Sequence, residues 1–266
     1  MLIFPSAFGL NVVLSTELLA YYRRLSHETL TVVDVETTGY RPPLSRVIEI
    51  SVLQASLENG VHYQQTHLVN PQVPIPPAIT RFTGITQDMV NTAPLSVDIW
   101  RDYLPLVNAG ILTAHNLAFD YSFLKSEFNY IDVPFSRAED EQLCTVMLAR
   151  LMLPDLPSRS LPNLVEHFGF DVGRSHRAAA DTQACWLLAK HLLTEIQTEA
   201  DDVLLTRFRQ QWLTLKYAAT LLNTTSKQAK TWLKNAKVEP RLVGRYQTLM
   251  YQRCEIERVH QELYKF

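Results

Sequence analysis

Two carboxylates at the end of an apolar run form the clearest chemical pattern in this sequence. The run is Val33-Asp34-Val35-Glu36-Thr37-Thr38-Gly39. Alternate side chains of a strand point to the same face, so Asp34 and Glu36 project together. Two such carboxylates repel one another and are costly to bury while both are charged. A hard divalent cation such as Mg²⁺ or Mn²⁺ relieves the repulsion, because it prefers carboxylate oxygens. The alternative is a strand that ends in a solvated acidic turn.

A third carboxylate belongs to the pattern Ala114-His115-Asn116-Leu117-Ala118-Phe119-Asp120, where a short apolar strand gives way to a helix. Asn116 can cap this helix, which then carries Asp120 near its first turn. A carboxylate near a helix N-terminus is favourable in any protein, so Asp120 taken alone does not indicate a site.

The last pattern is His176-Arg177-Ala178-Ala179-Ala180-Asp181. Five residues along one helix leave about 140° between two side chains, so His176 and Asp181 would diverge on a helix. They converge only if His176 lies in the loop before the helix, which Gly173-Arg174-Ser175 permits. A lone histidine in a loop, or a lone aspartate on a helix, is more often a solvated residue. Together the patterns are much more specific than any one of them.

The elements that must position these residues follow a layered α/β pattern. A continuous apolar strand is expected at 30–35, and two alternating strands at 46–57 and 61–69 flank the turn signal Glu58-Asn59-Gly60. A short buried strand is expected at 111–114. Helices are expected at 94–107, 117–128, 144–153, 161–168 and 178–197. The four prolines within 71–77 exclude regular structure there.

The blocks D-x-E-T-T-G, H-N-x-x-F-D and H-x₄-D, in this order, resemble the DEDDh 3′→5′ exonuclease superfamily, and within it the proofreading epsilon subunits of DNA polymerase III. The resemblance covers residues 29–197 and includes Arg46-Val47-Ile48-Glu49-Ile50, similar to the second strand of that family. Phe82-Thr83-Gly84-Ile85-Thr86 is similar to the family's H-G-I loop, with Thr83 in place of the histidine. The resemblance implies an RNase H-like fold: a mixed five-stranded sheet, its second strand antiparallel, flanked by helices. The fifth strand should lie between Asp132 and Cys144.

The resemblance also implies a mechanism, in which water attacks a phosphodiester with two Mg²⁺ or Mn²⁺ ions bound. Asp34 would bridge both ions, Glu36 and Asp181 would complete the site of the water-activating ion, and Asp120 would support the second. His176 would be the general base, because an imidazole of ordinary basicity changes charge near neutral pH.

The expected reaction releases nucleoside 5′-monophosphates from a 3′ end. By resemblance, Thr37 and Thr38 meet the terminal nucleotide, Ile85 lies against the last base and Asn116 lies near the site. Single-stranded or frayed DNA is the favoured substrate. Two alternatives stay open: a ribonuclease that trims RNA 3′ ends, and a non-catalytic nucleic-acid-binding protein on an exonuclease scaffold.

Composition separates the chain into an acidic body and a basic tail. Residues 1–200 hold 13 Lys/Arg and 21 Asp/Glu, a net charge of −8, whereas residues 201–266 hold 12 and 6, a net charge of +6. We expect a helical extension at 1–28, the exonuclease domain at 29–198 and a basic domain at 203–266. The three separated cysteines indicate no disulfide framework, and no apolar stretch is long enough for a membrane span. We therefore expect a soluble, cytoplasmic protein.

In the basic tail, helices are expected at 213–222, 226–236 and 254–263, with a hairpin between 240 and 251. This pattern resembles the small excisionase or MerR-like winged helix-turn-helix domains. Such a domain contacts nucleic acid, or packs on the body or docks a protein. The expected phosphate contacts are Lys227, Lys230, Lys234, Arg241 and Arg245.

A short segment of the tail, Gln210-Gln211-Trp212-Leu213-Thr214-Leu215, is similar to the peptides that bind sliding clamps. A polymerase or clamp is thus a further partner to consider. The alternative is that Trp212 and Leu215 belong to the core of the tail domain.

Overall fold

The computed structural model describes residues 13–173 and 175–264, so part of the expected N-terminal extension lies outside the described residues. The chain divides into two compact units. The large unit comprises residues 24–148 and 157–195. The small unit comprises the described residues up to Arg23, together with residues 149–156 and 196–264. None of the helices in the described part of the chain combines the length and apolarity that a bilayer crossing needs.

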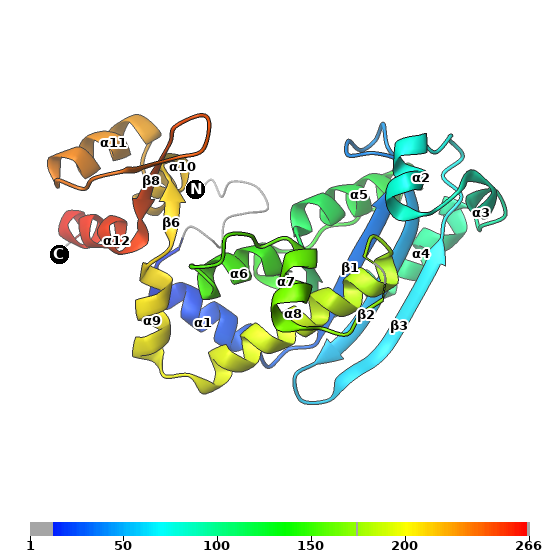
Figure 1. The fold of residues 1–266 in the computed structure, drawn as a ribbon, viewed down its shortest axis with the longest axis horizontal. Helices are drawn as coiled ribbons and strands as arrows, with labels where there is room; N and C mark the ends of the chain where they lie inside the picture. The colour runs from blue at the N-terminus through cyan, green and yellow to red at the C-terminus, as the bar shows by residue number, and fades with distance from the viewer. Residues whose placement is uncertain (1–12, 174, 265–266) are drawn as a thin grey trace. The chain divides into compact units, whose positions relative to one another are not determined.

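A mixed five-stranded sheet forms the centre of the large unit (Figure 1). Its strands are β1 (Leu30–Thr37), β2 (Val47–Ser56), β3 (Gly60–Leu68), β4 (Ile111–Ala114) and β5 (Gln142–Cys144), in the order β3-β2-β1-β4-β5. β2 is antiparallel to both β1 and β3, whereas β4 is parallel to β1 and β5. The expected fifth strand is β5, and the antiparallel second strand agrees with the expectation.

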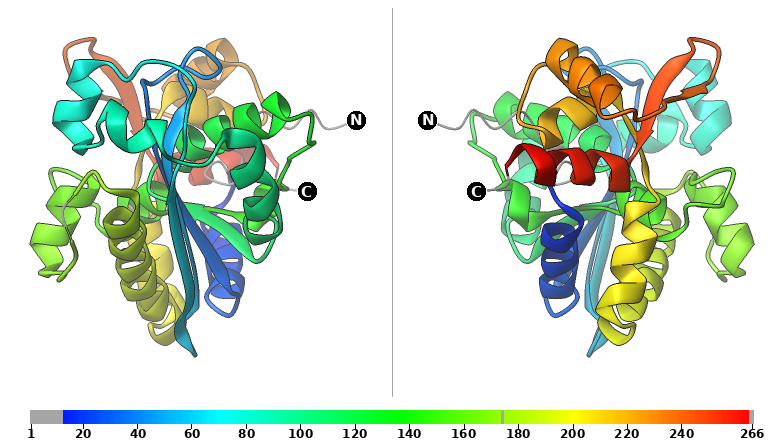
Figure 2. Two further views of the ribbon diagram at one scale, coloured as in Figure 1. Left: turned by 90° about the vertical axis from the view of Figure 1, so that its right-hand side faces the viewer. Right: turned by 90° about the vertical axis from the view of Figure 1, so that its left-hand side faces the viewer.

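Helices cover both faces of this sheet (Figure 2). The helices of this unit are α2 (Pro77–Thr83), α3 (Gln87–Asn91), α4 (Ser96–Val107), α5 (Leu117–Tyr130), α6 (Thr145–Met152, through Leu148), α7 (Leu161–Phe168) and α8 (Ala178–Thr198, through Glu195), with a 3-10 turn at Glu139–Glu141. On one face, α4 and α5 bury an apolar core against β1, β2 and β4 that includes Val33, Val35, Trp100, Phe123 and Phe128. The other face meets α8, where Ser51 Oγ and Thr182 Oγ1 lie 3.0 Å apart.

The alternation of β1 decides which residues reach which face. Val33 and Val35 enter the core beneath α4 and α5, so Asp34 and Glu36 point to the opposite face. Asp34 is paired with Ser51 in the register of β1 and β2, and Ser51 is the residue that meets α8. A strand that is otherwise buried therefore brings two acids to the face on which α8 lies.

The small unit contains α1 (Ser15–Leu25, through Arg23), α9 (Asp201–Arg209) and a three-stranded sheet of order β6-β8-β7. Its strands are β6 (Trp212–Thr214), β7 (Arg241–Val243) and β8 (Thr248–Gln252), and its other helices are α10 (Leu215–Leu221), α11 (Ser226–Asn235) and α12 (Arg253–Leu263). An apolar cluster that includes Ala218, Leu222, Leu233 and Ile256 joins these helices.

Three local expectations were wrong. Pro77 begins helix α2, because the first position of a helix needs no backbone N–H. Residues 212–214 form strand β6 rather than the start of a helix, because they pair with β8 almost forty residues later in the chain. Trp212 is exposed rather than in the core, and the Arg241 guanidinium lies over its ring at 5.8 Å. Leu215 does pack against the apolar cluster of this unit.

Candidate active site

Three carboxylates converge where β1 meets α8. Oxygen atoms of Asp34, Glu36 and Asp181 all lie within 4.8 Å of one another. Asp34 is half-buried and Glu36 is buried, both on β1, while Asp181 lies in the first turn of α8. These three carboxylates are close enough together to bind one metal ion. In the described part of the chain, they are the group of metal-ligating side chains that has this spacing.

Asp120 approaches the same strand from the first turn of α5, where it is buried. Its Oδ1 accepts a hydrogen bond from the backbone N–H of Val35 at 3.2 Å. Asn116 occupies the N-cap position with φ of 79°, but its side chain makes no capping hydrogen bond. The capping role expected for Asn116 was therefore wrong, because the left-handed backbone takes the side chain out of that position.

Burial raises the pKa of all four carboxyls, and repulsion from neighbouring carboxylates adds to the effect. Burial and the charges of Asp120, Asp181 and Glu36 hold the pKa of Asp34 well above its ordinary value. The pKa of Glu36 and that of Asp120 are each raised to about 8, with burial as the largest cause. Burial also raises the pKa of Asp181. Without a cation, Glu36 and Asp120 therefore favour the protonated form at neutral pH.

His176 precedes α8 and turns back toward Asp181. Its φ of 64° is in the left-handed region, and its backbone N–H donates to Oδ2 of Asp181 at 2.9 Å. The imidazole stacks on the ring of Phe82, with centroids 3.8 Å apart and planes at 30°. A loop position before the helix is thus what allows His176 and Asp181 to share one site.

A partly buried ion pair anchors the start of α8. The Arg177 guanidinium donates to Glu49 on β2, with Nη2 2.6 Å from Oε1. The backbone N–H of Ala178 donates to Oε2 of the same carboxylate at 2.9 Å. Glu49 therefore ties the helix N-terminus, and the loop that carries His176, to the central sheet.

The carboxylates and His176 line a pocket of about 300 Å³. Of the expected nucleotide contacts, Thr37 lines this pocket, whereas Thr38, Asn116 and Ile85 do not. The Thr38 hydroxyl instead accepts from the backbone N–H of Arg46. Ile85 is fully buried with Ile48, Ile75 and Val90.

Four apolar or aromatic residues that sequence reasoning did not single out also line the pocket: Tyr40, Ile79, Phe82 and Phe119. Phe119 stands within the H-N-x-x-F-D pattern and Phe82 begins the block that includes Gly84 and Ile85, so both belong to recognised motifs, although neither had been given a role. Nothing in the local sequence indicates Tyr40 or Ile79, which reach the pocket only through the tertiary structure.

The donor set fits a divalent cation. All the donors of the cluster are carboxylate oxygens, which hard cations prefer. The Arg177 guanidinium lowers the pKa of Glu36, but its hydrogen bonds go to Glu49. The carboxylate oxygens of the cluster therefore remain suited to a bound cation.

This mixed sheet, with acids from β1, α5 and α8 brought together on it, defines an RNase H-like nuclease fold. A crystal structure of Escherichia coli exonuclease I in complex with a dT13 oligonucleotide has the same fold, with a TM-score of 0.56 and 21% identity over 62% of this chain and 41% of that one. The expected α/β class is confirmed. The exonuclease family RNase_T matches residues 31–188, and the chain belongs to this family.

Two relatives in the DNA polymerase III group agree with this family assignment. The chain is 31% identical to the DNA polymerase III subunit epsilon of Treponema pallidum, over 60% of this chain and 74% of that subunit. It is 33% identical to the PolC-type DNA polymerase III of Oceanobacillus iheyensis over 64% of this chain. The matched region is 12% of the length of that polymerase.

Proposed function

We propose that this chain is a metal-dependent 3′→5′ exonuclease that releases nucleoside 5′-monophosphates from single-stranded or frayed DNA. The observation that carries the proposal is the convergence of Asp34, Glu36 and Asp181, with His176 and the buried Asp120 in the same pocket. Membership of an exonuclease family supports a nuclease. The 3′→5′ polarity, the mononucleotide products and the metal dependence go beyond family membership and are what we propose.

In this proposal Asp34, Glu36 and Asp181 would hold one Mg²⁺ or Mn²⁺ ion, and Asp120 with Asp34 would hold a second. Bound ions of this kind stabilise negative charge on a phosphate and lower the pKa of water. His176 accepts the proton of the attacking water, and the bond from its backbone N–H to Asp181 keeps the histidine beside the carboxylates. Phe119 offers an apolar ring to the terminal base.

Single-stranded ends suit this pocket better than paired ends. A volume of about 300 Å³ is at the small end of ligand pockets and holds a single nucleotide. The relatives are DNA polymerase III chains, which favours DNA over RNA as the polymer. Trimming of RNA by the same residues is the second candidate.

The test is incubation of the purified chain with 5′-labelled single-stranded DNA and RNA of equal sequence, in Mg²⁺ or Mn²⁺ and in EDTA. We expect a ladder that shortens from the 3′ end, faster for DNA. Asp34→Asn is the matched control, because it keeps the shape of the side chain and removes its charge. Cleavage that persists in EDTA or in Asp34→Asn would overturn the proposal, and absence of all cleavage would favour a binding protein.

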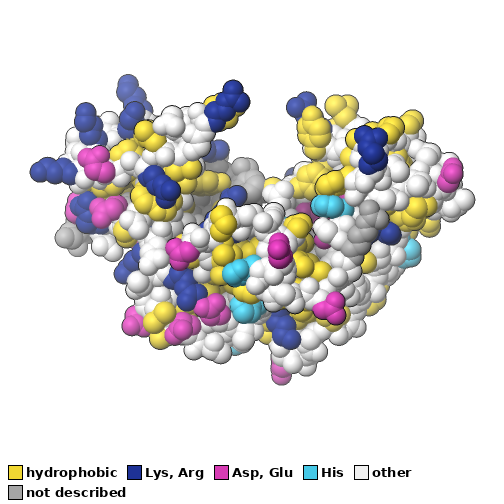
Figure 3. Space-filling model, viewed as in Figure 1, with side chains coloured by type: hydrophobic (Ala, Val, Ile, Leu, Met, Phe, Trp, Pro, Cys, Tyr) yellow, Lys and Arg dark blue, Asp and Glu magenta, His cyan; other side chains and the backbone are white. Residues whose placement is uncertain are grey.

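We also propose that the small unit contacts the nucleic acid backbone. Lys and Arg side chains project from its surface over α10, α11 and the β7–β8 hairpin (Figure 3). Lys227, Lys230 and Lys234 are exposed, while Ala229 and Leu233 of the same helix are buried. Arg241 and Arg245 are exposed on the hairpin and beside it. A winged helix-turn-helix mode of binding is part of this proposal.

Fluorescence anisotropy with a labelled oligonucleotide tests this second contact. Reversal of the three α11 lysines to glutamate should weaken binding and reduce its salt dependence, by about 0.7 in log–log slope for each phosphate contact to a single strand. Lys190→Glu on α8 is the control for reversal of one exposed lysine elsewhere on the chain. Equal affinity of the α11 variant and this control would exclude α11 from the interface.

A further inference from the structure

We propose that a groove on the outer side of α5 holds the nucleotides that lie upstream of the scissile bond. The inference rests on the proposed exonuclease function and adds a second binding site to it. The groove has a volume of about 560 Å³ and lies wholly within the large unit. Its occupant is a single nucleic acid strand.

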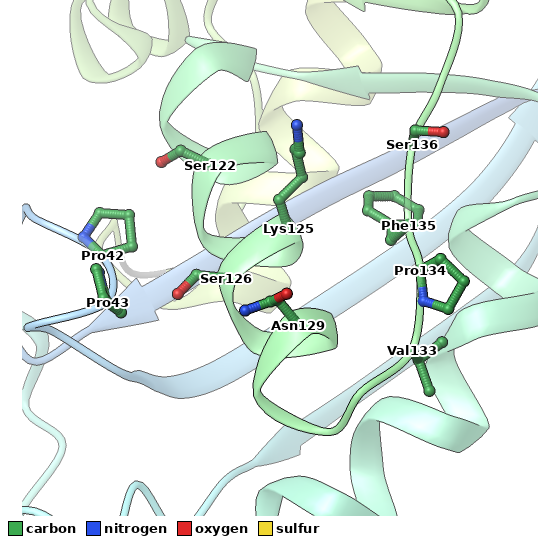
Figure 4. A pocket seen from close by; sticks show the side chains of 10 residues that line it. All are labelled: Pro42, Pro43, Ser122, Lys125, Ser126, Asn129, Val133, Pro134, Phe135 and Ser136. Carbon is green, nitrogen blue, oxygen red and sulfur yellow. The ribbon is translucent and has the colours of Figure 1, made fainter.

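The groove has a helical floor and two walls of loop (Figure 4). Ser122, Lys125, Ser126 and Asn129 of α5 form the floor. One wall is the cis pair Pro42-Pro43 in the loop after β1, and the other is the extended segment 133–136. A floor of polar side chains between apolar walls suits a ligand that has both charged and flat apolar groups.

The groove continues from the candidate active site along the same two segments. In the loop after β1, Gly39 and Tyr40 line the active-site pocket, and Pro42 lines the groove. On α5, Phe119 lines the pocket and Ser122 lines the groove one turn later. Residues three and four apart lie on one side of a helix, so this side of α5 runs from the pocket into the groove.

The spacing along α5 matches a short run of nucleotides. At 1.5 Å of rise per residue, the distance along the helix from Asp120 is about 7.5 Å to Lys125 and about 13.5 Å to Asn129. At roughly 3.4 Å per stacked nucleotide, these distances correspond to about two to four nucleotides. A strand whose 3′ end occupies the pocket therefore places its next phosphates over the groove.

The chemistry of the groove fits a phosphate backbone. Its ten lining residues include one cation, Lys125, and no acid, although the body of the chain has an excess of acidic residues. Within the described part of the chain, the side chains of Ser126, Asn129 and Ser136 make no hydrogen bond and remain available as donors. Pro42, Pro43 and Pro134 supply apolar surface for sugars and bases.

The experiment compares two substrates that differ in whether they can reach the groove. The p-nitrophenyl ester of thymidine 5′-monophosphate fills only the pocket, while a single-stranded oligonucleotide also fills the groove. We expect Lys125→Glu to reduce kcat/KM for the oligonucleotide about tenfold more than for the ester, and to reduce the log–log salt slope by about 0.7. Ser126→Trp fills the groove without a change of charge and should show the same selective loss. Lys190→Glu controls for net charge.

The outcomes separate the two proposals. If the wild-type chain hydrolyses neither substrate in Mg²⁺ or Mn²⁺, the exonuclease proposal fails and the groove loses its assignment with it. If the wild-type chain hydrolyses both, and Lys125→Glu and Ser126→Trp lose no more activity on the oligonucleotide than on the ester, only the groove assignment is overturned. That second result would reassign the groove to a protein or peptide.

Discussion

The ring of Phe82 lies against the ring of His176, with centroids 3.8 Å apart and planes at 30°. Phe82 comes from α2 and His176 from the loop before α8, so the contact joins two segments almost a hundred residues apart. Phe82 is 55% exposed, which is high for a phenylalanine that contributes only to folding. We infer from this contact that Phe82 orients the imidazole, and it also lines the pocket.

Loss of this stacking should reduce turnover more than substrate binding. We expect Phe82→Ala to lower kcat about tenfold, because a loosely held imidazole is less often aligned with the attacking water. Phe82→Tyr preserves an aromatic ring and should retain most of the activity. A kcat for Phe82→Ala equal to that of the wild-type chain would show that the contact does not orient His176.

Removal of the imidazole itself should have a larger effect. His176→Ala should lower kcat by roughly 10²–10⁴-fold, the usual contribution of a general base. The four carboxylates remain in this variant, so the rise in melting temperature on addition of Mn²⁺ should persist. Unchanged turnover would exclude the general-base role, and loss of the Mn²⁺ effect would instead give His176 a part in metal binding.

The acidic cluster should make the metal-free protein less stable at high pH. A carboxyl whose pKa is raised by folding binds its proton more tightly in the folded than in the unfolded state, so its contribution to stability is present at low pH and is lost as pH rises. For Glu36 this loss runs from its ordinary pKa of 4.5 to about 8. We therefore expect the free energy of unfolding in EDTA to fall across this range.

Chemical denaturation in EDTA at several pH values measures this dependence. Glu36→Gln and Asp120→Asn should each flatten it, and each should be more stable than the wild-type chain near pH 9. Mn²⁺ should stabilise the wild-type chain most at high pH, where the carboxylates have lost their protons. Identical pH dependence in the variants and the wild-type chain would exclude these two carboxyls as its source.

A buried ion pair attaches α5 to the sheet. Nε and Nη2 of Arg46 donate to Glu127 at 2.8 Å each, and the backbone N–H of Val47 donates to the same carboxylate at 3.0 Å. Glu127→Leu leaves Arg46 buried without its partner, which should cost about 3–5 kcal/mol of unfolding free energy. Urea denaturation gives the value, with exposed Glu166→Gln on α7 as the control. A loss below about 1 kcal/mol, the range of surface pairs, would contradict this account.

Local sequence determined most of the elements that carry the site. An apolar run that ends in alternating acids predicted β1 and the shared direction of Asp34 and Glu36, because side-chain direction in a strand depends only on periodicity. The need for His176 to precede its helix followed from the rotation per residue of an α-helix. The order of the motifs indicated the family before any contact was known.

Tertiary structure decided which side chains surround these acids. Phe82 and Ile79 reach the pocket, and Ile85 turns into a buried cluster, because helix α2 packs in a way that no local periodicity specifies. Strand β6 forms through pairing with β8, which outweighs the helical preference of residues 213–222. The raised pKa values also depend on burial and on charges from three separate elements. Spacing along a chain specifies directions within an element, whereas the distances between elements arise only when the core packs.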